Sequence, residues 1–212
     1  MMREMKHITL SHKSTSYLKH KLELKMQSGW QQSSVIYESK DGVHCVDMEI
    51  ETSPVIYTSI SGILYPKNAK AQASAIDLYK ANKIPEIRFI PSAVENLTLL
   101  LENNDARLKV HSNWRYRLYS ESHLLTELFL NNGFLPDHLH RDFFVPFKGK
   151  DCVRSYDIEF SNSDDSLMNI VIDTRRDLDL SSQFMLYNPV PSGTGLTLVD
   201  MHLIDSLIKR NT

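Results

Sequence analysis

The chain has 212 residues, of which 42% are hydrophobic and 24% charged, and its formal net charge is −2. This composition is typical of a globular protein with a sizeable core and excludes a largely disordered chain. No apolar run approaches the length of a membrane span, and the N-terminal residues lack the apolar core of a signal peptide. We therefore expect no membrane partner.

The charge is unevenly distributed along the chain. Residues 1–120 carry 16 Lys and Arg against 12 Asp and Glu, whereas residues 121–212 carry 8 against 14. A basic first half and an acidic second half suit either a polyanionic partner or docking between the two halves. The two cysteines, Cys45 and Cys152, are too few for a disulfide framework and predict free thiols in a reducing, cytoplasmic location.

The first third of the chain is expected to form a β-meander with one helix. Residues 6–10 alternate as a short strand, and residues 14–29 predict a helix, although their leucines also alternate as in a strand. Asp41-Gly42 supplies the turn of a hairpin over residues 33–53, because this turn needs positive φ. Residues 54–65 are the expected third strand of the meander.

The middle of the chain predicts three helices from their caps and stop signals, and three short strands from alternation. Asn68 lies near the cap of the first helix and Pro85 follows its end, whereas Ser92 and Glu95 have capping-box spacing at the second. Gly133 marks the C-terminal end of the third helix. The helices are expected over residues 68–85, 92–105 and 120–134, and the strands over 86–90, 107–111 and 114–119.

The last part of the chain predicts a second hairpin-like pair over residues 152–160 and 167–173, a strand over 184–188, and an amphipathic helix over 197–210. An apolar stripe on that helix packs on its own domain or on a second copy of the chain, which would make a homo-oligomer. The stripe consists of Leu198, Val199, Leu203, Ile204, Leu207 and Ile208.

This order of elements predicts an α+β fold with a mainly antiparallel sheet and three to five helices. A basic α+β lobe would span residues 1–135, and residues 136–151 would form a connecting loop. An acidic segment over residues 152–212, a β-hairpin plus the terminal helix, would pack with the first lobe as one domain or form a small C-terminal lobe.

One candidate site is the aromatic and basic stretch that follows residue 106. If residues 114–119 form a strand, Trp114 and Tyr116 lie on one face and Arg115 and Arg117 on the other, which gives a basic ribbon with aromatic side chains. Exposed aromatic rings stack on bases while Arg and Lys neutralise phosphates, so this ribbon suits single-stranded nucleic acid. The alternative is that the aromatic rings belong to the core and the arginines face solvent. The candidate nucleic-acid-binding residues are Arg107, Lys109, Trp114, Arg115, Tyr116 and Arg117.

A second candidate site is a cluster of His and Asp in the segment 136–142. Asp137, His138 and His140 are a metal-ligand set, and His138, His140 and Asp142 could serve as catalytic acid, base and orienting group. The spacing is generic and no HExxH or CxxC motif accompanies it, so a solvated loop with incidental histidines is the alternative.

From the sequence we predict a cytoplasmic binding protein whose basic N-terminal half contacts nucleic acid or an acidic protein partner. One alternative is a hydrolase or nuclease that uses the His and Asp cluster. Another is a non-catalytic component of a protein assembly. The sequence does not identify a cofactor.

Overall fold

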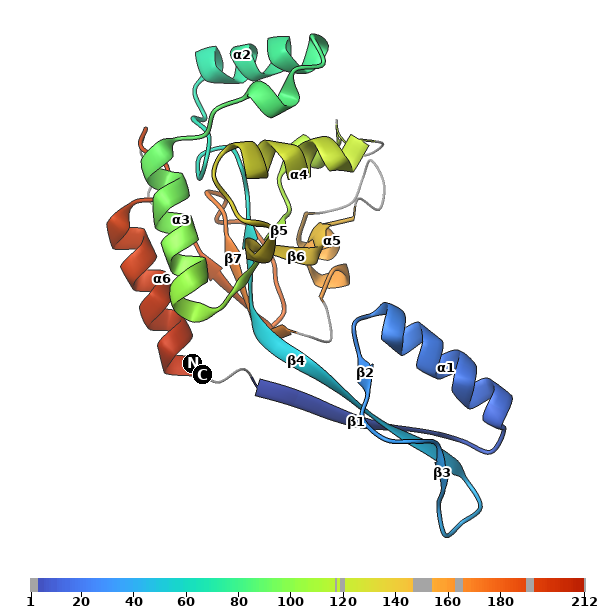
Figure 1. Cartoon of the computed structure of the whole chain (residues 1–212). Coiled ribbons are helices and arrows are strands. Elements are labelled where there is room, and N and C mark those ends of the chain that lie inside the picture. The colour runs from blue at the N-terminus through green and yellow to red at the C-terminus, as the bar shows by residue number, and fades with distance from the viewer. Residues whose placement is uncertain are drawn as a thin grey trace. The chain divides into compact units, whose positions relative to one another are not determined.

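The structure, a computed structural model, describes residues 4–116, 118, 121–146, 154–162, 166–189 and 193–211 (Figure 1). The chain divides into two compact units. Unit 1 comprises Met1–Ser53 and Ser163–Leu167, and unit 2 comprises Pro54–Asn162 and Met168–Thr212. The division therefore falls within strand β4 (His44–Thr58) and not in the segment 136–151, where a boundary was expected.

Unit 1 is an antiparallel sheet that carries one helix and is not the expected meander, because its strands are arranged around β4. It contains β1 (Glu4–His12), α1 (Thr15–Gln27), β2 (Gln31–Gln32), β3 (Tyr37–Glu38) and the first part of β4. Strands β1, β2 and β3 each pair antiparallel with β4. The expected turn at Asp41-Gly42 is confirmed, because Gly42 has a φ of 69° and its N–H donates to the Ser39 carbonyl at 3.0 Å. The core of unit 1 consists of Leu18, Leu22, Trp30, Val46, Met48 and Ile50.

Unit 2 is an α/β fold whose sheet has the strand order β6-β5-β4-β7-β8. Strand β4 pairs parallel with β5, β5 pairs parallel with β6, and β7 pairs parallel with β8. After β4 the elements are α2 (Ala69–Lys80), η1 (Ile84–Glu86), α3 (Pro91–Asn104), β5 (Arg107–Val110), η2 (Asn113–Tyr116), α4 (Ser122–Asn131), η4 (Pro136–His138), β6 (Leu139–Phe144), α5 (Arg154–Phe160), β7 (Ser166–Ile172), β8 (Phe184–Tyr187) and α6 (Leu198–Asn211).

The predicted α+β fold with a mainly antiparallel sheet is therefore wrong, because the central sheet is mostly parallel. The expected third strand of the meander, residues 54–65, is not a separate strand, since residues 54–58 continue β4 and pair with the distant β5. Parallel strands are buried on both faces and read as continuous apolar runs. Val55, Ile56 and Tyr57 fit that rule, because all three side chains are fully buried.

Successive residues of these strands reach different core clusters on the two faces of the sheet. Ile56 and Ile170 belong to the larger cluster, together with side chains from α3, α4 and α6. Tyr57 and Val171 belong to a second cluster, together with Ile158 of α5. Helices α3 and α6 lie side by side in Figure 1. The sheet is therefore a central layer. Because both of its faces are covered by packed side chains, a site can form only at the ends of its strands.

The five predicted helices are present, although α2 ends at Lys80, before the end that was expected near Pro85. Helix α5 is a sixth, so the described residues contain more than the expected three to five helices. Asn68 caps α2 through a hydrogen bond from the Ala71 N–H at 2.9 Å. Helix α3 begins at Pro91 rather than after a Ser92 cap, because proline suits the first helical position. At the start of α6, the Thr197 N–H donates to the Asp200 carboxylate and the Asp200 N–H donates to the Thr197 hydroxyl, as in a capping box.

Three of the predicted strands are not strands. Of residues 86–90, Glu86 is the last residue of η1 and residues 87–90 follow it without sheet pairing. Residues 113–116 form the 3₁₀ turn η2. The segment 152–160 was expected to be one strand of a hairpin-like pair, but residues 154–160 form helix α5. Conversely, the expected loop 136–151 contains strand β6. No helix among the described residues is both long and apolar enough to cross a bilayer.

Candidate ligand-binding site

The strand order of unit 2 reverses between β4 and β7. The chain moves outward from β4 through β5 to β6, and then returns to the other side of β4 to form β7 and β8. The Ser59 N–H donates to the Ile172 carbonyl at 3.1 Å, so the carboxyl ends of β4 and β7 meet. In open α/β sheets, ligands bind in the crevice at the carboxyl ends of the strands where the order reverses.

A pocket of about 460 Å³ lies at this point, within the size range of small-molecule sites. Its polar wall is formed by residues just past the strand ends, together with the first residue of α5, and includes Ser59, Ser112, Asn113, Arg154, Asp173 and Arg175. Its apolar wall comes from α2, η1 and the segment 114–118, and includes Ile76, Tyr79, Ile84, Ile87, Trp114 and Leu118. The two walls suit a ligand with a charged end and an apolar body.

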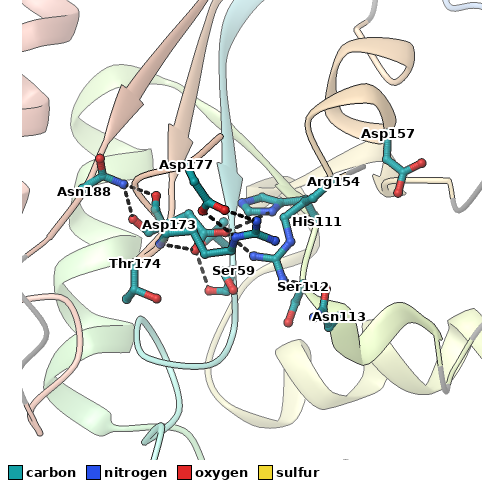
Figure 2. Close-up of polar contacts among 12 residues, drawn as sticks. Ser59, His111, Ser112, Asn113, Arg154, Asp157, Asp173, Thr174, Asp177 and Asn188 are labelled. Atoms are coloured by element: carbon teal, nitrogen blue, oxygen red, sulfur yellow. Dashed lines mark hydrogen bonds and ion pairs between the residues drawn. The ribbon is translucent and has the colours of Figure 1, made fainter. Parts of the chain in front are cut away.

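A buried ion pair lies in the polar wall. Arg154 donates from Nη1 to Oδ2 of Asp173 at 2.5 Å and from Nη2 to Oδ1 of Asn113 at 2.6 Å (Figure 2). The other carboxylate oxygen of Asp173 accepts from the Arg175 backbone N–H at 2.9 Å, and its carbonyl accepts from Asn188 at 2.8 Å. Asp173 is 1% exposed and Arg154 is 8% exposed. The pair therefore joins α5 to the residues that follow β5 and β7.

His111 lies behind this ion pair and is fully buried. Its Nδ1 is 3.6 Å from Oδ2 of Asp173, and neither ring nitrogen has a well-formed hydrogen bond among the described residues. Burial lowers the pKa of His111 to about 3, although the Asp173 carboxylate opposes this shift; Arg154 and Arg115 lower the pKa further. The imidazole is therefore neutral at pH 7.

Two further cations line the pocket and are more exposed than Arg154. Lys67 donates to the Thr174 hydroxyl at 3.3 Å. Arg175 donates from Nε and Nη2 to the two carboxylate oxygens of Asp177 at 2.8 Å and 2.5 Å. Among the described residues of the lining, the charged side chains are Lys67, Arg154 and Arg175 against Asp173. The pocket has a surplus of positive charge.

The loop between β4 and α2 closes one side of the pocket. Trp114 is half-buried, donates from Nε1 to the Ser61 hydroxyl at 3.0 Å and packs edge-on against Tyr65. Gly62 has a φ of +87°, and a Cβ there would lie 2.8 Å from the Thr174 methyl group. Glycine is therefore required where this loop passes Thr174.

Two of the cations predicted to bind nucleic acid point into the interior. Lys109 is 1% exposed and donates to the Ser161 carbonyl at 2.7 Å. Arg115 is fully buried and forms an ion pair with the equally buried Asp157. The ribbon expected from the sequence has no counterpart here, because a 3₁₀ turn does not alternate its side chains between two faces.

The other residues of that candidate set are dispersed. Arg107 is half-buried and bonds to Asp105 at 3.1 Å, and Trp114 lines the pocket. Arg117 and the side chain of Tyr116 lie outside the described part of the chain. A nucleic-acid role for this set stays a prediction.

The histidines of the second candidate set are buried, His138 in η4 and His140 in β6, and each accepts a hydrogen bond from the backbone of its own segment. His138 and His140 are 6% and 4% exposed, and each Nδ1 accepts a nearby backbone N–H, at 3.1 Å and 2.9 Å. Nε2 of His138 lies 3.3 Å from the Glu102 carboxylate, whereas Asp137 and Asp142 are exposed. Over the described ranges, no three His, Cys, Asp or Glu side chains form a group that could hold a metal. A catalytic or metal role here stays a prediction.

Apart from Trp114, which was a candidate for another role, the residues that line the pocket were missed in the sequence. Their signal is positional, since Ser59 and Asp173 come directly after the apolar strands β4 and β7, and Ser112 follows β5 at two residues. Polar residues at the carboxyl ends of parallel strands converge on one edge of the sheet. That signal can be used only if the strands are known to be parallel.

The sequence matches no protein-family model, and comparisons with curated proteins and with solved structures give no match either.

Proposed function

We propose that unit 2 binds a small molecule in the pocket at the carboxyl ends of β4, β5 and β7. The observation that carries this proposal is the pocket itself, which lies where the strand order reverses and has one charged and one apolar wall. An amphipathic ligand would place its charged end against the strand ends and its apolar body against α2 and Trp114.

Recognition rather than chemistry is the role that the polar wall supports. Both carboxylate oxygens of Asp173 already accept hydrogen bonds, from Arg154 and from the Arg175 backbone. His111 is fully buried and neutral, so it is not placed to exchange a proton with a ligand. The proposal agrees with the sequence analysis in assigning a binding role to the protein. It moves the ligand from an exposed basic surface into a pocket, because Lys109 and Arg115 are buried.

Filling the pocket tests this proposal. Ile76 lines the pocket from α2, so Ile76→Trp should block it, whereas the exposed Ala73 of the same helix provides the matched control Ala73→Trp. Thermal unfolding would be followed with nucleosides, nucleotides, sugar phosphates, aromatic amino acids and aromatic acids. A compound present at 100 times its Kd should stabilise the native chain and Ala73→Trp by about 2.7 kcal/mol. It should have no such effect on Ile76→Trp.

Two results would contradict the proposal. One is equal stabilisation of the Ile76→Trp and Ala73→Trp variants, because the ligand would then bind elsewhere. The other is the absence of any stabilising compound in the panel, together with no small molecule retained by the purified protein in native mass spectrometry.

A reducing, cytoplasmic location forms part of the same proposal. Its support is the low cysteine count and the free, buried thiol of Cys45. Fractionation of the producing cells tests it, and recovery in the secreted or membrane fraction would contradict it.

A further inference from the structure

We infer that the ligand carries a phosphate monoester, which Lys67 and Arg175 bind at the polar wall, and that Asp177 occupies Arg175 until the ligand arrives. This inference rests on the proposed small-molecule pocket and specifies the chemistry of its charged end.

The charge of the lining residues favours a dianion. Arg154 and Asp173 neutralise each other in a buried ion pair, so two of the charges on the pocket wall cancel. Lys67 remains, and Arg175 adds a second positive charge once the ligand displaces Asp177 from its guanidinium group. A phosphate monoester carries about −1.5 to −2 charges at pH 7, whereas a carboxylate carries −1. The phosphate therefore matches the surplus more closely.

Both cations line the same pocket, together with Thr174. The Lys67 ammonium donates to the hydroxyl of Thr174, and Arg175 is the next residue in the chain. That hydroxyl can donate a further hydrogen bond to a phosphate oxygen. Lys67 forms no ion pair with any residue that the structure describes, so its charge is available to a ligand.

Asp177 is a competitor for the guanidinium of Arg175. It accepts both Arg175 bonds side by side, in the geometry that a phosphate would use, but it does not line the pocket. The hydrogen bonds from Arg175 lower the pKa of Asp177 to about 2, so the carboxylate is charged at neutral pH. Both side chains are exposed, 42% for Arg175 and 69% for Asp177, and exposed ion pairs of this kind exchange at small cost.

The apolar wall indicates what the phosphate is attached to. Trp114 and Tyr79 present aromatic rings, and Ile76, Ile84 and Ile87 add aliphatic surface. A flat ring joined to a phosphate fills both walls. Adenosine 5′-monophosphate and phenyl phosphate both join an aromatic ring to a phosphate monoester, but one is a nucleotide and the other is not. Both therefore serve as probes.

The experiment is isothermal titration of the full chain with adenosine 5′-monophosphate, phenyl phosphate, adenosine and benzoate. We expect at least one of the two phosphates to bind, and adenosine and benzoate to bind about tenfold more weakly or worse. Lys67→Met and Arg175→Met should each weaken phosphate binding about tenfold, as expected for the loss of one charge-assisted contact of about 1.4 kcal/mol. Lys70→Met, an exposed lysine outside the lining, is the control and should change nothing.

Asp177→Asn gives the sharpest test, because removal of the competitor should tighten phosphate binding. The expected gain is about two- to fivefold, the range for loss of an exposed ion pair. Asp179→Asn removes the same charge from an exposed position in the same loop and controls for long-range electrostatics. Equal gains in Asp177→Asn and Asp179→Asn would overturn the competitor role.

The outcomes separate this inference from the proposed function. If adenosine or benzoate binds as well as the phosphates, and Ile76→Trp abolishes that binding, the pocket stands and the phosphate assignment fails. If no probe and no panel compound responds to Ile76→Trp, the pocket itself fails as a binding site.

Discussion

His111 is the clearest case of a single residue whose chemistry is set by its surroundings. It directly follows β5, is fully buried, and lies beside a carboxylate and two guanidinium groups. A histidine alone in the sequence suggests a proton donor or a metal ligand. Burial instead holds this ring neutral and turns it into a source of acid sensitivity.

The pKa of His111 gives a prediction for stability against pH. In the unfolded chain its pKa is about 6.5, and in the folded chain it is about 3, so the unfolded state binds more protons between these values. The free energy of unfolding should therefore rise with pH from about 3 to 6.5 and level off above. One proton contributes a slope of at most about 1.4 kcal/mol per pH unit.

Urea unfolding of His111→Gln at a series of pH values tests this, because the variant should lose that part of the slope. His202→Gln, at an exposed position on α6, is the control and should keep the native profile. An unchanged slope in His111→Gln would mean that other groups cause the acid sensitivity.

At the scale of elements, α5 shows why local pattern was misleading. It buries Arg154 and Asp157, because Asp173 and Arg115 lie against them as partners. Its Tyr156 and Phe160 are exposed and stack on each other with ring centroids 6.3 Å apart. A segment that buries charges and exposes rings has the reverse of the usual amphipathic pattern. In the sequence, Tyr156, Ile158 and Phe160 alternate with polar residues, and such an alternation predicts a strand.

Helix α6 follows the usual pattern, but only part of its predicted stripe is buried. Met201, Ile204 and Ile208 are in the core, whereas Leu198, Val199 and Leu203 are exposed. The expected homo-oligomer would have to use the exposed part, and it stays a prediction.

Adjacent residues of α6 provide a matched pair for a stability prediction. Ile204→Ala removes a fully buried side chain and should lower the free energy of unfolding by about 2–5 kcal/mol. Leu203→Ala changes a side chain that is 52% exposed and should cost about 0.5 kcal/mol or less. Chemical denaturation of both variants measures the difference, and equal losses would mean that Leu203 is covered by a partner in solution.

At the scale of the whole molecule, the two tryptophans report on different units. Trp30 belongs to the core of unit 1, and Trp114 lines the pocket of unit 2. In a chain labelled with 5-fluorotryptophan, adenosine 5′-monophosphate should shift the Trp114 fluorine resonance and leave that of Trp30 in place. The variant Trp30→Phe assigns the two signals. A shift confined to Trp30 would place the ligand in unit 1.

Much of the local structure could be predicted from the sequence, because the interactions that set it are only a few residues apart. The Asn68 cap, the Asp41-Gly42 turn and the terminal helix depend on groups within about four residues of each other. The chain composition likewise indicates a sizeable core, and unit 2 has one.

The sheet direction and the pocket were decided only by the tertiary structure. Strand β4 pairs with β5 some fifty residues on, and nothing in a local alternation distinguishes a parallel from an antiparallel neighbour. Lys109, Arg115 and Arg154 look like surface cations in the sequence, yet each is buried, because an oxygen atom from a distant segment accepts its hydrogen bonds. Charges are expected at the surface unless such partners exist, and only the folded chain brings those partners together.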